Sequence, residues 1–570
     1  MAGLLFGAWI IRWVDVGTDS VWLDEAASWW FATRPLSQLW GDAAFWEPNP
    51  PLYYMVLKFW IALFGDSEIG IRSLSVVFNV ATVGVVYGMG RRVLLGREGE
   101  WIGWCAALLV LTHPMQVRYA QEARAYALLG LAFSLVLYGL LWFFAHPDEF
   151  ARSTKEFFRP ARGRTAATLS VVVGSTLAFW SHSTSILLVG SVLAAGAGLL
   201  IARSRFSISA CTKVLIVGAT LLLLWLPDLP YLISGMKQVN AGFWLSRPDA
   251  DDLMYFSDFL FGTWEIAQSD AGRIACTLIA VTMALGGTAA LMRRGQKHQA
   301  ILLASAAFLP VAVAFAASYL ITPIFIARSM LWIEIPFLLL IACCTLWITP
   351  QVGRIGVGLC ASALLATITL LHLGRPPKES WRDVARVLIA ESSADDLILV
   401  NTQYVEVPLL YYHVPEHVRA RWLIVPAPFP GLRSASGYPP GFMIRGEIVP
   451  ATLLHIADAA AKVRRIWYVQ RGGSNYDPVE KVLALLRTTY HDNRVRVRDR
   501  GAVLLSEFSN PQAGVKPPDS SATAVPTAIA SGQSPTSHRS VASSPAPCAP
   551  CSPLQSERAD RPPAGLPSEF

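Results

Sequence analysis

Long apolar runs dominate this sequence, and each is close to the length of helix that crosses a lipid bilayer. A shorter run from Met1 to Trp13 comes first, and longer runs follow at about residues 72–95, 101–116, 126–145, 165–181, 184–202, 212–233, 273–292, 299–320, 329–348 and 354–372. A membrane-spanning helix needs about 20 apolar residues. Lipid offers no hydrogen-bond partners, so the backbone must satisfy its own polar groups, as an α-helix does. We therefore expect an α-helical polytopic membrane protein with about 11 transmembrane helices.

The overall composition supports this class. Of the 570 residues, 53% are hydrophobic and 15% are charged, whereas soluble domains carry about 25% charge. The net charge of +7 does not indicate nucleic-acid binding, because the chain has no basic helix or aromatic–basic strip of the kind that follows a phosphate backbone. Lys and Arg collect in loops instead, which is the pattern of cytoplasmic loops in membrane proteins.

The positions of these basic residues predict the topology. Every second loop is basic, with Arg91, Arg92 and Arg97, then Arg152, Lys155, Arg159, Arg162 and Arg164, then Arg203, Arg205 and Lys213, and then Arg293, Arg294 and Lys297. The alternate loops, 14–71, 117–125, the turn at His182, 228–272 and 321–328, are then expected outside the cell (inner) membrane. An odd number of helices also places everything after about residue 373 outside.

Three regions are expected along the chain. Residues 1–372 form the transmembrane domain. Residues 373–510 are predicted to form a small extracytoplasmic α/β domain, because ESWRDVARVLIAES has helical periodicity and DDLILVN and RRIWYVQ resemble buried strands. Residues 511–570 are rich in Ser, Pro, Ala and Thr, and we expect a disordered tail there.

Two adjacent carboxylates, Asp24 and Glu25, follow the first apolar run in the stretch VWLDEAASWW. Two carboxylates near a low-dielectric boundary repel each other, and one of them can act as a general base on an acceptor hydroxyl. They can also hold a metal or a cationic acceptor. The competing interpretation is structural: Asp24 caps a helix that begins here. The residues alone leave both interpretations open.

The second outer loop, HPMQVRYAQEARAYAL at 113–128, gathers Arg118, Gln121, Glu122, Arg124 and Tyr126. Arg118 and Glu122 are four residues apart and are expected to pair on a helix. Arg124 has no obvious local partner in the sequence, and a guanidinium near a membrane surface suits a phosphate. The alternative is general contact with lipid headgroups.

Other outer-face residues have a structural and a functional interpretation each. Glu68 and Arg72 are spaced for a helical ion pair, which could orient the Asp24 loop. Tyr53 and Tyr54, in EPNPPLYYMVLKFW, fit a helix lying at the interface, either as an anchor or as the wall of a groove. His182 is a lone histidine in a turn. Arg328 lies at a helix end, where it either adds positive charge above a lipid phosphate or only extends its charged end to the membrane interface.

With these residues in hand, the chain resembles the GT-C superfamily of integral membrane glycosyltransferases. The resemblance is to family 39 and the RgtA/B/C/D-like group, relatives of protein mannosyltransferases and of the lipid A aminoarabinose transferase. It is carried by SVWLDEA at 20–26, NPPLYYMVLKFW at 49–60, GDSEIGIRSLSVVFN at 65–79 and QVRYAQEARAYAL at 116–128. Their order and spacing resemble the family over the first 130 residues or so.

The resemblance implies a GT-C fold, an outward-facing active site and a polyprenyl-phosphate sugar donor. It implies that Asp24 is the base and that Glu25 supports or shares this role. Gln121, Glu122 and Arg124 match the loop that faces the donor phosphate. Arg328 matches a family position, although Ser329 follows where Tyr is frequent. No cofactor is expected, and a divalent metal is compatible with the pattern.

The function expected is transfer of a hexose or pentose to an envelope glycan, a glycolipid such as lipopolysaccharide, a cell-wall glycan or a protein. The alternative is a polytopic lipid or sugar transporter or flippase, which predicts ionisable residues near the middle of spans and often paired repeats. In this sequence the acids and arginines cluster at helix ends. A non-catalytic assembly protein is a third possibility.

Overall fold

The computed structural model describes most of the chain. The described residues are 1–40, 49–240, 245, 247–263, 267, 269–374, 378–401, 403–425, 448, 450–472, 480–490, 492–499 and 503–509. The predicted disordered tail, 511–570, lies outside the described residues.

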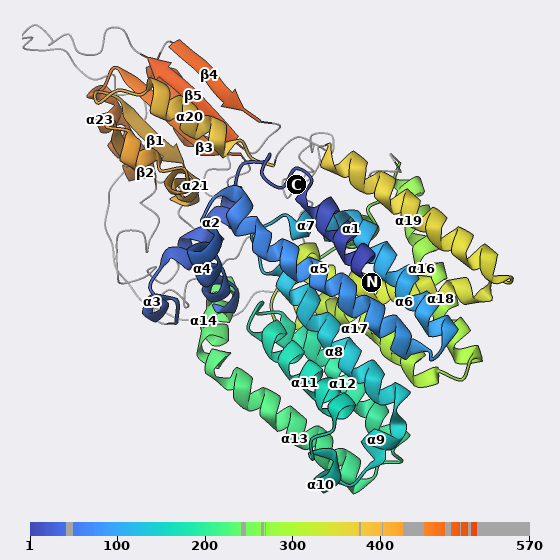
Figure 1. The fold of residues 1–570 in the computed structure, drawn as a ribbon. Coiled ribbons are helices and arrows are strands. Elements are labelled where there is room, and N and C mark those ends of the chain that lie inside the picture. Colours follow the sequence, from blue (N-terminus) through green and yellow to red (C-terminus); the bar gives the residue numbers. More distant parts are fainter. Residues whose placement is uncertain are drawn as a thin grey trace, which may run out of the picture.

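A bundle of long apolar helices makes up the larger part of the molecule (Figure 1). Within the described residues, eight helical segments are long and apolar enough to cross a membrane. They are α5 (Glu68–Val93), α8 (Tyr126–Ala145), α12 (Ser185–Arg203), α13 with α14 (Ile208–Trp225 and Leu229–Asn240), α16 (Asp270–Arg293), α17 (Lys297–Leu320), η4 with α18 (Ala327–Ile333 and Glu334–Cys344) and α19 (Gln351–Leu373). The chain is therefore a multi-pass membrane protein.

Three further predicted spans also form helices in the bundle. They are α1 (Ala2–Trp13), α6 (Arg97–Thr112) and α11 (Arg162–Phe179), with 12, 16 and 18 residues. At about 1.5 Å per residue, α1 and α6 are shorter than the hydrocarbon core. All three pack along longer helices, since α1 and α6 contact α5 and α11 contacts α8. The expected eleven helices thus correspond to these three and the eight full-length segments.

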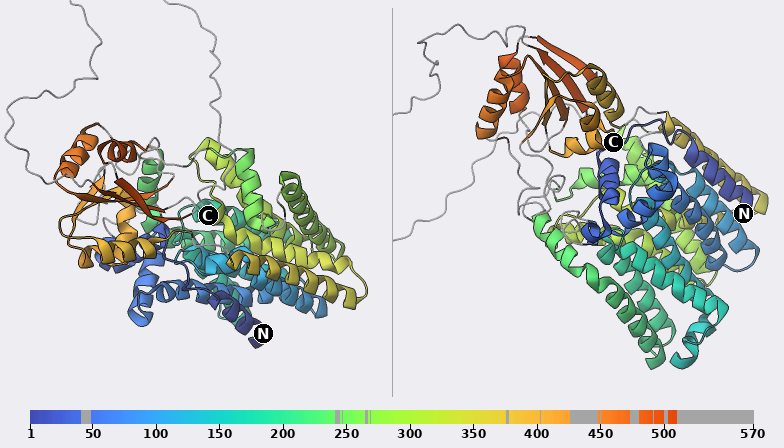
Figure 2. Two further views of the ribbon diagram at one scale, coloured as in Figure 1. Left: turned by 90° about the horizontal axis from the view of Figure 1, so that it is seen from above. Right: turned by 60° about the vertical axis from the view of Figure 1, so that its left-hand side comes forward.

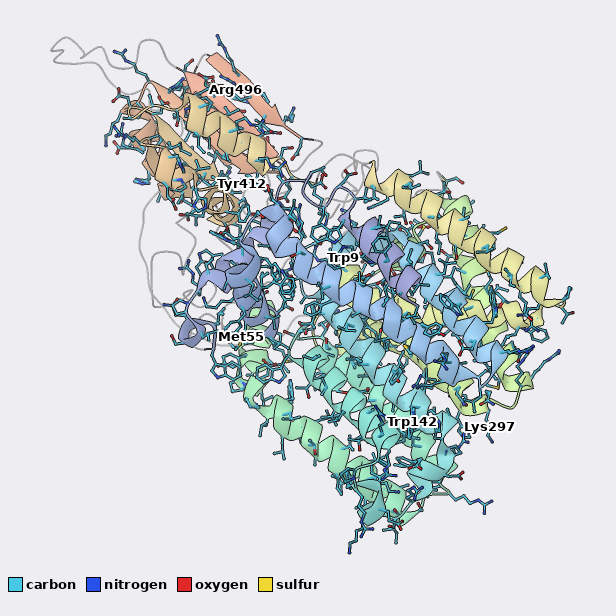
Figure 3. The ribbon with its side chains drawn as sticks, in the orientation of Figure 1. Trp9, Met55, Trp142, Lys297, Tyr412 and Arg496 are labelled. Carbon is cyan, nitrogen blue, oxygen red and sulfur yellow. The ribbon has the colours of Figure 1, made fainter. Side chains whose placement is uncertain are left out.

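The predicted basic loops lie at one end of the bundle. The short helices α9 (Pro147–Ala151) and α10 (Thr154–Phe157) mark that end in Figure 1. Figure 3 shows Lys297 far from Tyr412 and Arg496, which belong to the opposite end. The predicted outer loops carry α2 (Leu23–Thr33), α3 (Leu36–Trp40), α4 (Leu52–Phe64), α7 (Pro114–Ala120) and α15 (Ala250–Phe261). The separation of the two ends agrees with the charge pattern, and which end faces outward stays a prediction.

The C-terminal region is a three-layer α/β domain that projects from the end bearing α2 (Figure 2). Its five strands are ordered β2-β1-β3-β5-β4, with β1, β2 and β3 parallel and β5 antiparallel to β3 and β4. The strands are β1 (Leu397–Asn401), β2 (Arg421–Val425), β3 (Arg465–Arg471), β4 (Asp492–Arg498) and β5 (Val503–Ser509). β1 and β3 lie where DDLILVN and RRIWYVQ predict strands, so the predicted α/β domain is confirmed; its limits, 373–510, stay a prediction.

Helices cover both faces of this sheet. One face packs on α20 (Trp381–Glu391), α21 (Glu406–Tyr411) and α22 (Val414–His417), and the other on α23 (Pro450–Ala461) and α24 (Lys481–Thr489). Along β1, Ile398 and Val400 face one layer while Leu397 and Leu399 face the other. Burial on both faces explains why this strand is a continuous apolar run instead of an alternating one.

The domain is joined to the membrane bundle through α2 and α4. Trp29, Tyr53 and Leu57 share one buried apolar cluster with Val407 and Tyr411 of α21. Trp29 also meets Tyr411 edge-on, with ring centres 5.3 Å apart. The tryptophans beside Asp24, Trp22, Trp29 and Trp30, are therefore packed against protein.

Candidate active site

Asp24 lies in the first turn of α2, where its carboxylate reaches a partly open part of the outer end. Trp22 is the N-cap residue, and helix α2 begins at Leu23. The Asp24 side chain is 25% exposed and lies 3.5 Å, Oδ2 to Nη2, from Arg328. Asp24 is therefore not the N-cap residue of this helix, as the structural interpretation proposed. Its carboxylate faces Arg328 instead.

Arg124 completes a pair of guanidinium groups around this residue. Its Nη1 donates to the backbone carbonyl oxygen of Asp24 and to Ser28 Oγ, both at 3.3 Å. Arg124 comes from the loop before α8 and Arg328 from the start of η4, 204 positions later. The two residues predicted to face a phosphate thus meet at the predicted base. Two guanidiniums against one carboxylate leave an excess of positive charge, which suits an anionic group.

The charges around Asp24 act on its ionisation. Burial by itself would raise the pKa of the Asp24 carboxyl, but the positive charges of Arg124, Arg328, Arg471 and Lys378 outweigh burial and hold this pKa below its ordinary value. The carboxylate is consequently ionised at neutral pH and is able to accept a proton.

His182 and Tyr126 lie next to this group. The Tyr126 and His182 rings are 6.4 Å apart, centre to centre. Burial and the positive charges of Arg124 and Arg328 lower the pKa of His182 to about 3, so the imidazole is neutral. Its Nδ1 accepts from the Thr184 N–H at 3.4 Å, which leaves Nε2 as the protonated, donating nitrogen.

Glu25, the other half of the acidic pair, has different surroundings. It is fully buried, and Arg72 donates to it twice, from Nε to Oε1 at 2.8 Å and from Nη2 to Oε2 at 2.7 Å. The Ala123 N–H also donates to Oε1, at 2.9 Å. A carboxylate held in this way ties α2 to α5 and to the second outer loop.

The predicted pairing of Glu68 with Arg72 is wrong. Arg72 turns toward Glu25, while Glu68 accepts from Arg382 of α20 and from the Tyr412 hydroxyl. Helical spacing permitted the local pair, but a bidentate contact with a fully buried carboxylate offers Arg72 stronger hydrogen bonds. Arg72 without Glu68 still orients the Asp24 loop, because its Nη1 and Nη2 also donate to carbonyl oxygens of residues 16, 19 and 20.

Gln121 and Glu122 form a second cluster on the far side of this loop. Gln121 Nε2 donates to the carbonyl oxygens of Arg12 and Val14. Glu122 accepts from Lys378 and lies 3.8 Å from Arg118, in the expected helical pair. These two predicted residues lie beside different side chains from those around Arg124.

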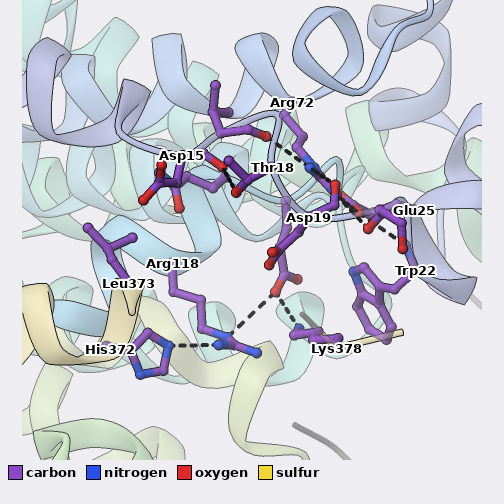
Figure 4. Close-up of a pocket in the computed structure, with 14 residues that line it drawn as sticks. Asp15, Thr18, Asp19, Trp22, Glu25, Arg72, Arg118, His372, Leu373 and Lys378 are labelled. Atoms are coloured by element: carbon purple, nitrogen blue, oxygen red, sulfur yellow. Dashed lines mark hydrogen bonds and ion pairs between the residues drawn. The ribbon is translucent and has the colours of Figure 1, made fainter. Parts of the chain in front are cut away.

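A polar cavity of about 70 Å³ lies between the first outer loop and the side chains of Gln121 and Glu122 (Figure 4). Its wall includes residues from the first loop, α2, α5, the second loop, the end of α19 and the segment after it. They are Asp15, Asp19, Trp22, Glu25, Arg72, Arg118, Gln121, Glu122, His372 and Lys378. Asp24 and Arg124 are not part of this wall. The cavity lies between the first loop and the second outer loop, but the predicted base, Asp24, does not open into it.

Tyr53 and Tyr54 are buried against α2. They are 1% and 4% exposed, and the Tyr53 hydroxyl lies 3.3 Å from Ser75 Oγ. Phe59, Leu63 and Phe64, on the other side of α4, are 58%, 76% and 57% exposed. An exposed apolar face on a short helix at the bundle end fits the anchor interpretation.

Three residues at this site were not predicted from the sequence: Lys378, Glu379 and Arg471. Lys378 Nζ lies 4.2 Å from the centre of the Trp22 ring. Glu379 accepts from the Leu23 N–H at 2.9 Å and from Arg471 Nε at 2.8 Å. All three follow the last membrane helix in the sequence, and nothing in their local sequence indicates that they lie close to the first outer loop.

No metal site emerges from the described side chains. Within the described ranges, no group of three or more His, Cys, Asp and Glu side chains is placed to hold a metal ion. The expectation that no cofactor is needed stays a prediction.

Comparison with known proteins finds similarity only at the level of structure. No family model and no curated protein sequence matches the chain. Among solved structures, it is similar to ArnT from Cupriavidus metallidurans in the apo state, with 16% identity and a TM-score of 0.46 over 89% of this chain and 97% of that one. ArnT bound to undecaprenyl phosphate gives the same identity and coverage with a TM-score of 0.45.

An archaeal enzyme gives a similar result. The chain is similar to the Archaeoglobus fulgidus oligosaccharyltransferase tethered with an acceptor peptide, with 10% identity and a TM-score of 0.45 over 82% of this chain and 69% of that one. At such low identity, the described side chains themselves have to carry any functional inference.

Proposed function

We propose that this protein is a membrane glycosyltransferase of the GT-C type. It moves a hexosyl or pentosyl group from a polyprenyl-phosphate donor to a hydroxyl or amine of an envelope glycan, glycolipid or protein acceptor, on the outer face of the cell membrane. One observation carries the proposal: an ionised carboxylate, Asp24, lies beside two guanidinium groups, Arg124 and Arg328, at the end of an apolar helix bundle.

The position of the site favours a lipid-borne donor. The exposed apolar side of α4 anchors it at the membrane boundary, and α4 packs against α2 through its other side, so Asp24 lies near the depth where the phosphate of a prenyl chain would be. A phosphate on such a chain would meet Arg124 and Arg328 first. Arg suits a phosphate because its planar fork donates two parallel hydrogen bonds.

The reaction follows from these charges. The acceptor oxygen or nitrogen attacks the anomeric carbon of the sugar, and its proton passes to Asp24. The bond between that carbon and the phosphate oxygen breaks, and its electron pair leaves with the phosphate. Arg124 and Arg328 stabilise the negative charge that grows there. The described site offers no second carboxylate as a nucleophile, since Glu25 is held by Arg72 and the buried Glu379 by Arg471, so we expect inversion at the anomeric carbon.

The other predicted residues have supporting roles in this proposal. Glu25 positions Asp24 by holding the first turn of α2 on Arg72. The neutral His182 offers an N–H to the donor or the acceptor. Gln121 and Glu122 fix the second loop through α1 and Lys378. Tyr53 and Tyr54 form part of the packing behind α2.

A transfer assay tests the proposal. The full chain in nanodiscs is incubated with radiolabelled polyprenyl-phosphate sugars and envelope extract, and the products are identified by mass spectrometry. We expect the label in an envelope glycan, glycolipid or protein, and a matching product missing from the glycolipids and glycans of cells without the gene. Equal envelopes with and without the gene, and no transfer from any polyprenyl-phosphate sugar, would contradict the proposal.

A transporter is the second candidate, and one observation favours it. A buried polar chain runs through the bundle from Arg12 to Asn79, Gln116 and Glu334, with hydrogen bonds of 2.6, 2.9 and 2.9 Å. Ionisable groups inside a membrane bundle often mark transport pathways. Uptake of labelled sugar lipid into proteoliposomes without covalent transfer would support that candidate. In a glycosyltransferase this chain of residues instead fixes α1 to the bundle.

A further inference from the structure

Glu379, which follows the last membrane helix in the sequence, lies at the start of α2. Ser20 Oγ donates to the backbone carbonyl oxygen of Glu379. The Glu379 carboxylate is 2% exposed and accepts from the Leu23 N–H at 2.9 Å, the Trp381 indole N–H and Arg471 Nε. A residue of the C-terminal domain therefore binds the backbone immediately before Asp24.

This contact supplies something that the α2 sequence lacks. The first N–H groups of a helix have no partner within the helix, and an N-cap side chain usually accepts from one of them. The N-cap residue of α2 is Trp22, whose side chain is a donor only. Glu379 provides the missing acceptor, and its negative charge also matches the positive end of the helix dipole.

A second carboxylate beside Asp24 has an electrostatic cost, and Arg471 offsets it. Glu379 alone would disfavour the charged form of Asp24, because like charges repel. Arg471, the last residue of β3, donates to Glu379 Oε1 at 2.8 Å. Its positive charge also favours the ionised form of Asp24.

We propose that Glu379 and Arg471 are positioning residues for Asp24, so that the C-terminal domain forms part of the active site. Glu379 fixes the first turn of α2, and Arg471 keeps the surroundings of Asp24 positive. The proposal rests on the role of Asp24 as the base in the proposed function. It predicts that the domain acts on the reacting carboxylate itself, in addition to any role in recognising an acceptor.

The charged and titratable groups of this site come from every neighbouring element. They are Arg124 before α8, Arg328 in η4, Lys378 and Glu379 before α20, Arg471 in β3, Tyr126 in α8, His182 before α12 and Glu25 in α2 itself. Two of these groups, Arg124 and Arg328, contact Asp24 and belong to the membrane bundle, not to the C-terminal domain. Any effect of Arg471 is therefore an increment on their contribution.

The test measures the ionisation of Asp24 directly. Dicyclohexylcarbodiimide modifies protonated carboxyl groups, so the extent of Asp24 labelling against pH, read by peptide mass spectrometry on the full chain in detergent, reports its pKa. Arg471→Gln keeps a side-chain N–H for Glu379 and removes the charge. We expect the pH of half-maximal labelling to rise by up to about one unit. Arg471→Lys should restore the wild-type value.

Two further variants separate charge from structure. Glu379→Gln removes a negative charge, so it should not raise the labelling pH. Arg465→Ala is the matched control, because Arg465 lies at the other end of β3 and pairs with Asp396; it should label like the wild type. A wild-type labelling curve for Arg471→Gln would overturn the proposal, as would equal shifts in Arg471→Gln and Arg465→Ala.

The acid limb of kcat/KM for sugar transfer should shift with the labelling curve. If the labelling shifts while no polyprenyl-phosphate sugar is transferred by the wild type, the proposed function is wrong and the positioning roles stand. If transfer occurs but Arg471→Gln changes neither curve, the function stands and the positioning roles are wrong.

Discussion

Asp24 and Glu25 are neighbours in the sequence, yet the structure gives them opposite surroundings. Asp24 is a quarter exposed, and its carboxylate meets Arg328 at 3.5 Å. Glu25 is fully buried and takes two short hydrogen bonds from Arg72. A helix turns by about 100° per residue, so adjacent side chains leave it in different directions. One points to the open end of the site and the other into the packing.

This difference assigns separate tasks to two chemically similar groups. A base must exchange protons with a substrate, which requires access and a carboxylate that is free to bind a proton. A buried carboxylate with a bidentate arginine has neither, and it stabilises the local fold instead. The resemblance to GT-C enzymes grouped the two acids in one role. Variants of Asp24 and of Glu25 should therefore have opposite effects on activity and on stability.

The largest effect is expected for Asp24→Asn. It removes the proton acceptor while keeping nearly the same shape, so sugar transfer should fall by about 10²–10⁴-fold. The melting temperature in detergent should stay close to the wild-type value, because the side chain is partly exposed. Transfer assays and thermal unfolding on the same preparation make the measurement.

Asp251→Asn is the matched control for that change. Asp251 is also an acid in the first turn of a helix, α15, and it is exposed. It should transfer sugar at the wild-type rate. Normal turnover by Asp24→Asn would show that the open carboxylate is not the base.

Glu25→Gln should show the reverse pattern, with a loss of stability. Breaking a buried ion pair by neutralising one partner costs about 3–5 kcal/mol, because Arg72 is left as a buried charge without its counterion. The melting temperature should fall clearly, while protein that stays folded keeps measurable transfer. Glu416→Gln, at an exposed ion pair on α22, should leave the melting temperature unchanged. A stable but inactive Glu25→Gln would place Glu25 in the chemistry.

Arg328→Ala tests the charge on the open side. Loss of one group that stabilises the leaving phosphate should lower kcat/KM by about 10²-fold. Arg328→Lys should recover part of it, since the charge remains but the bidentate fork is lost. Arg162→Ala is the control, because Arg162 is exposed and is the first residue of α11, in one of the predicted basic loops. Equal activity of Arg328→Ala and Arg162→Ala would remove Arg328 from the site.

Sequence patterns predicted the elements that depend on local periodicity. The span at 126–145 coincides with α8, and RRIWYVQ coincides in part with β3, because hydrophobic length and alternation follow from burial. The sequence motifs also selected Asp24, Arg124 and Arg328, which the fold brings together from three separate segments. These three residues could be identified in the sequence because each is an ionisable residue at the end of an apolar run.

Contacts between distant segments could not be predicted in the same way. The choice of Glu25 over Glu68 as the partner of Arg72 depends on where α2 docks on α5. Lys378 and Arg471 lie in a domain whose local sequence resembles any α/β domain. The hydrogen bond from the Leu23 N–H to Glu379 joins residues 356 positions apart, and such a contact produces no periodic pattern in the sequence.

The smallest effect is expected for the pH dependence that Lys378 causes. The charge of Lys378 acts on Asp24, and its side chain lines the same cavity as Glu25. Burial is the main cause that lowers the pKa of Lys378, to about 8. The ammonium is charged below that pH and neutral above it, so its attraction for an anionic donor is lost as the pH rises through 8. We expect KM for the donor to rise by a few-fold between pH 7 and pH 9. Lys378→Arg, which stays charged throughout, should remove this rise. If the rise persists in Lys378→Arg, another group carries the alkaline limb, and the positive field around Asp24 is then set by the arginines alone.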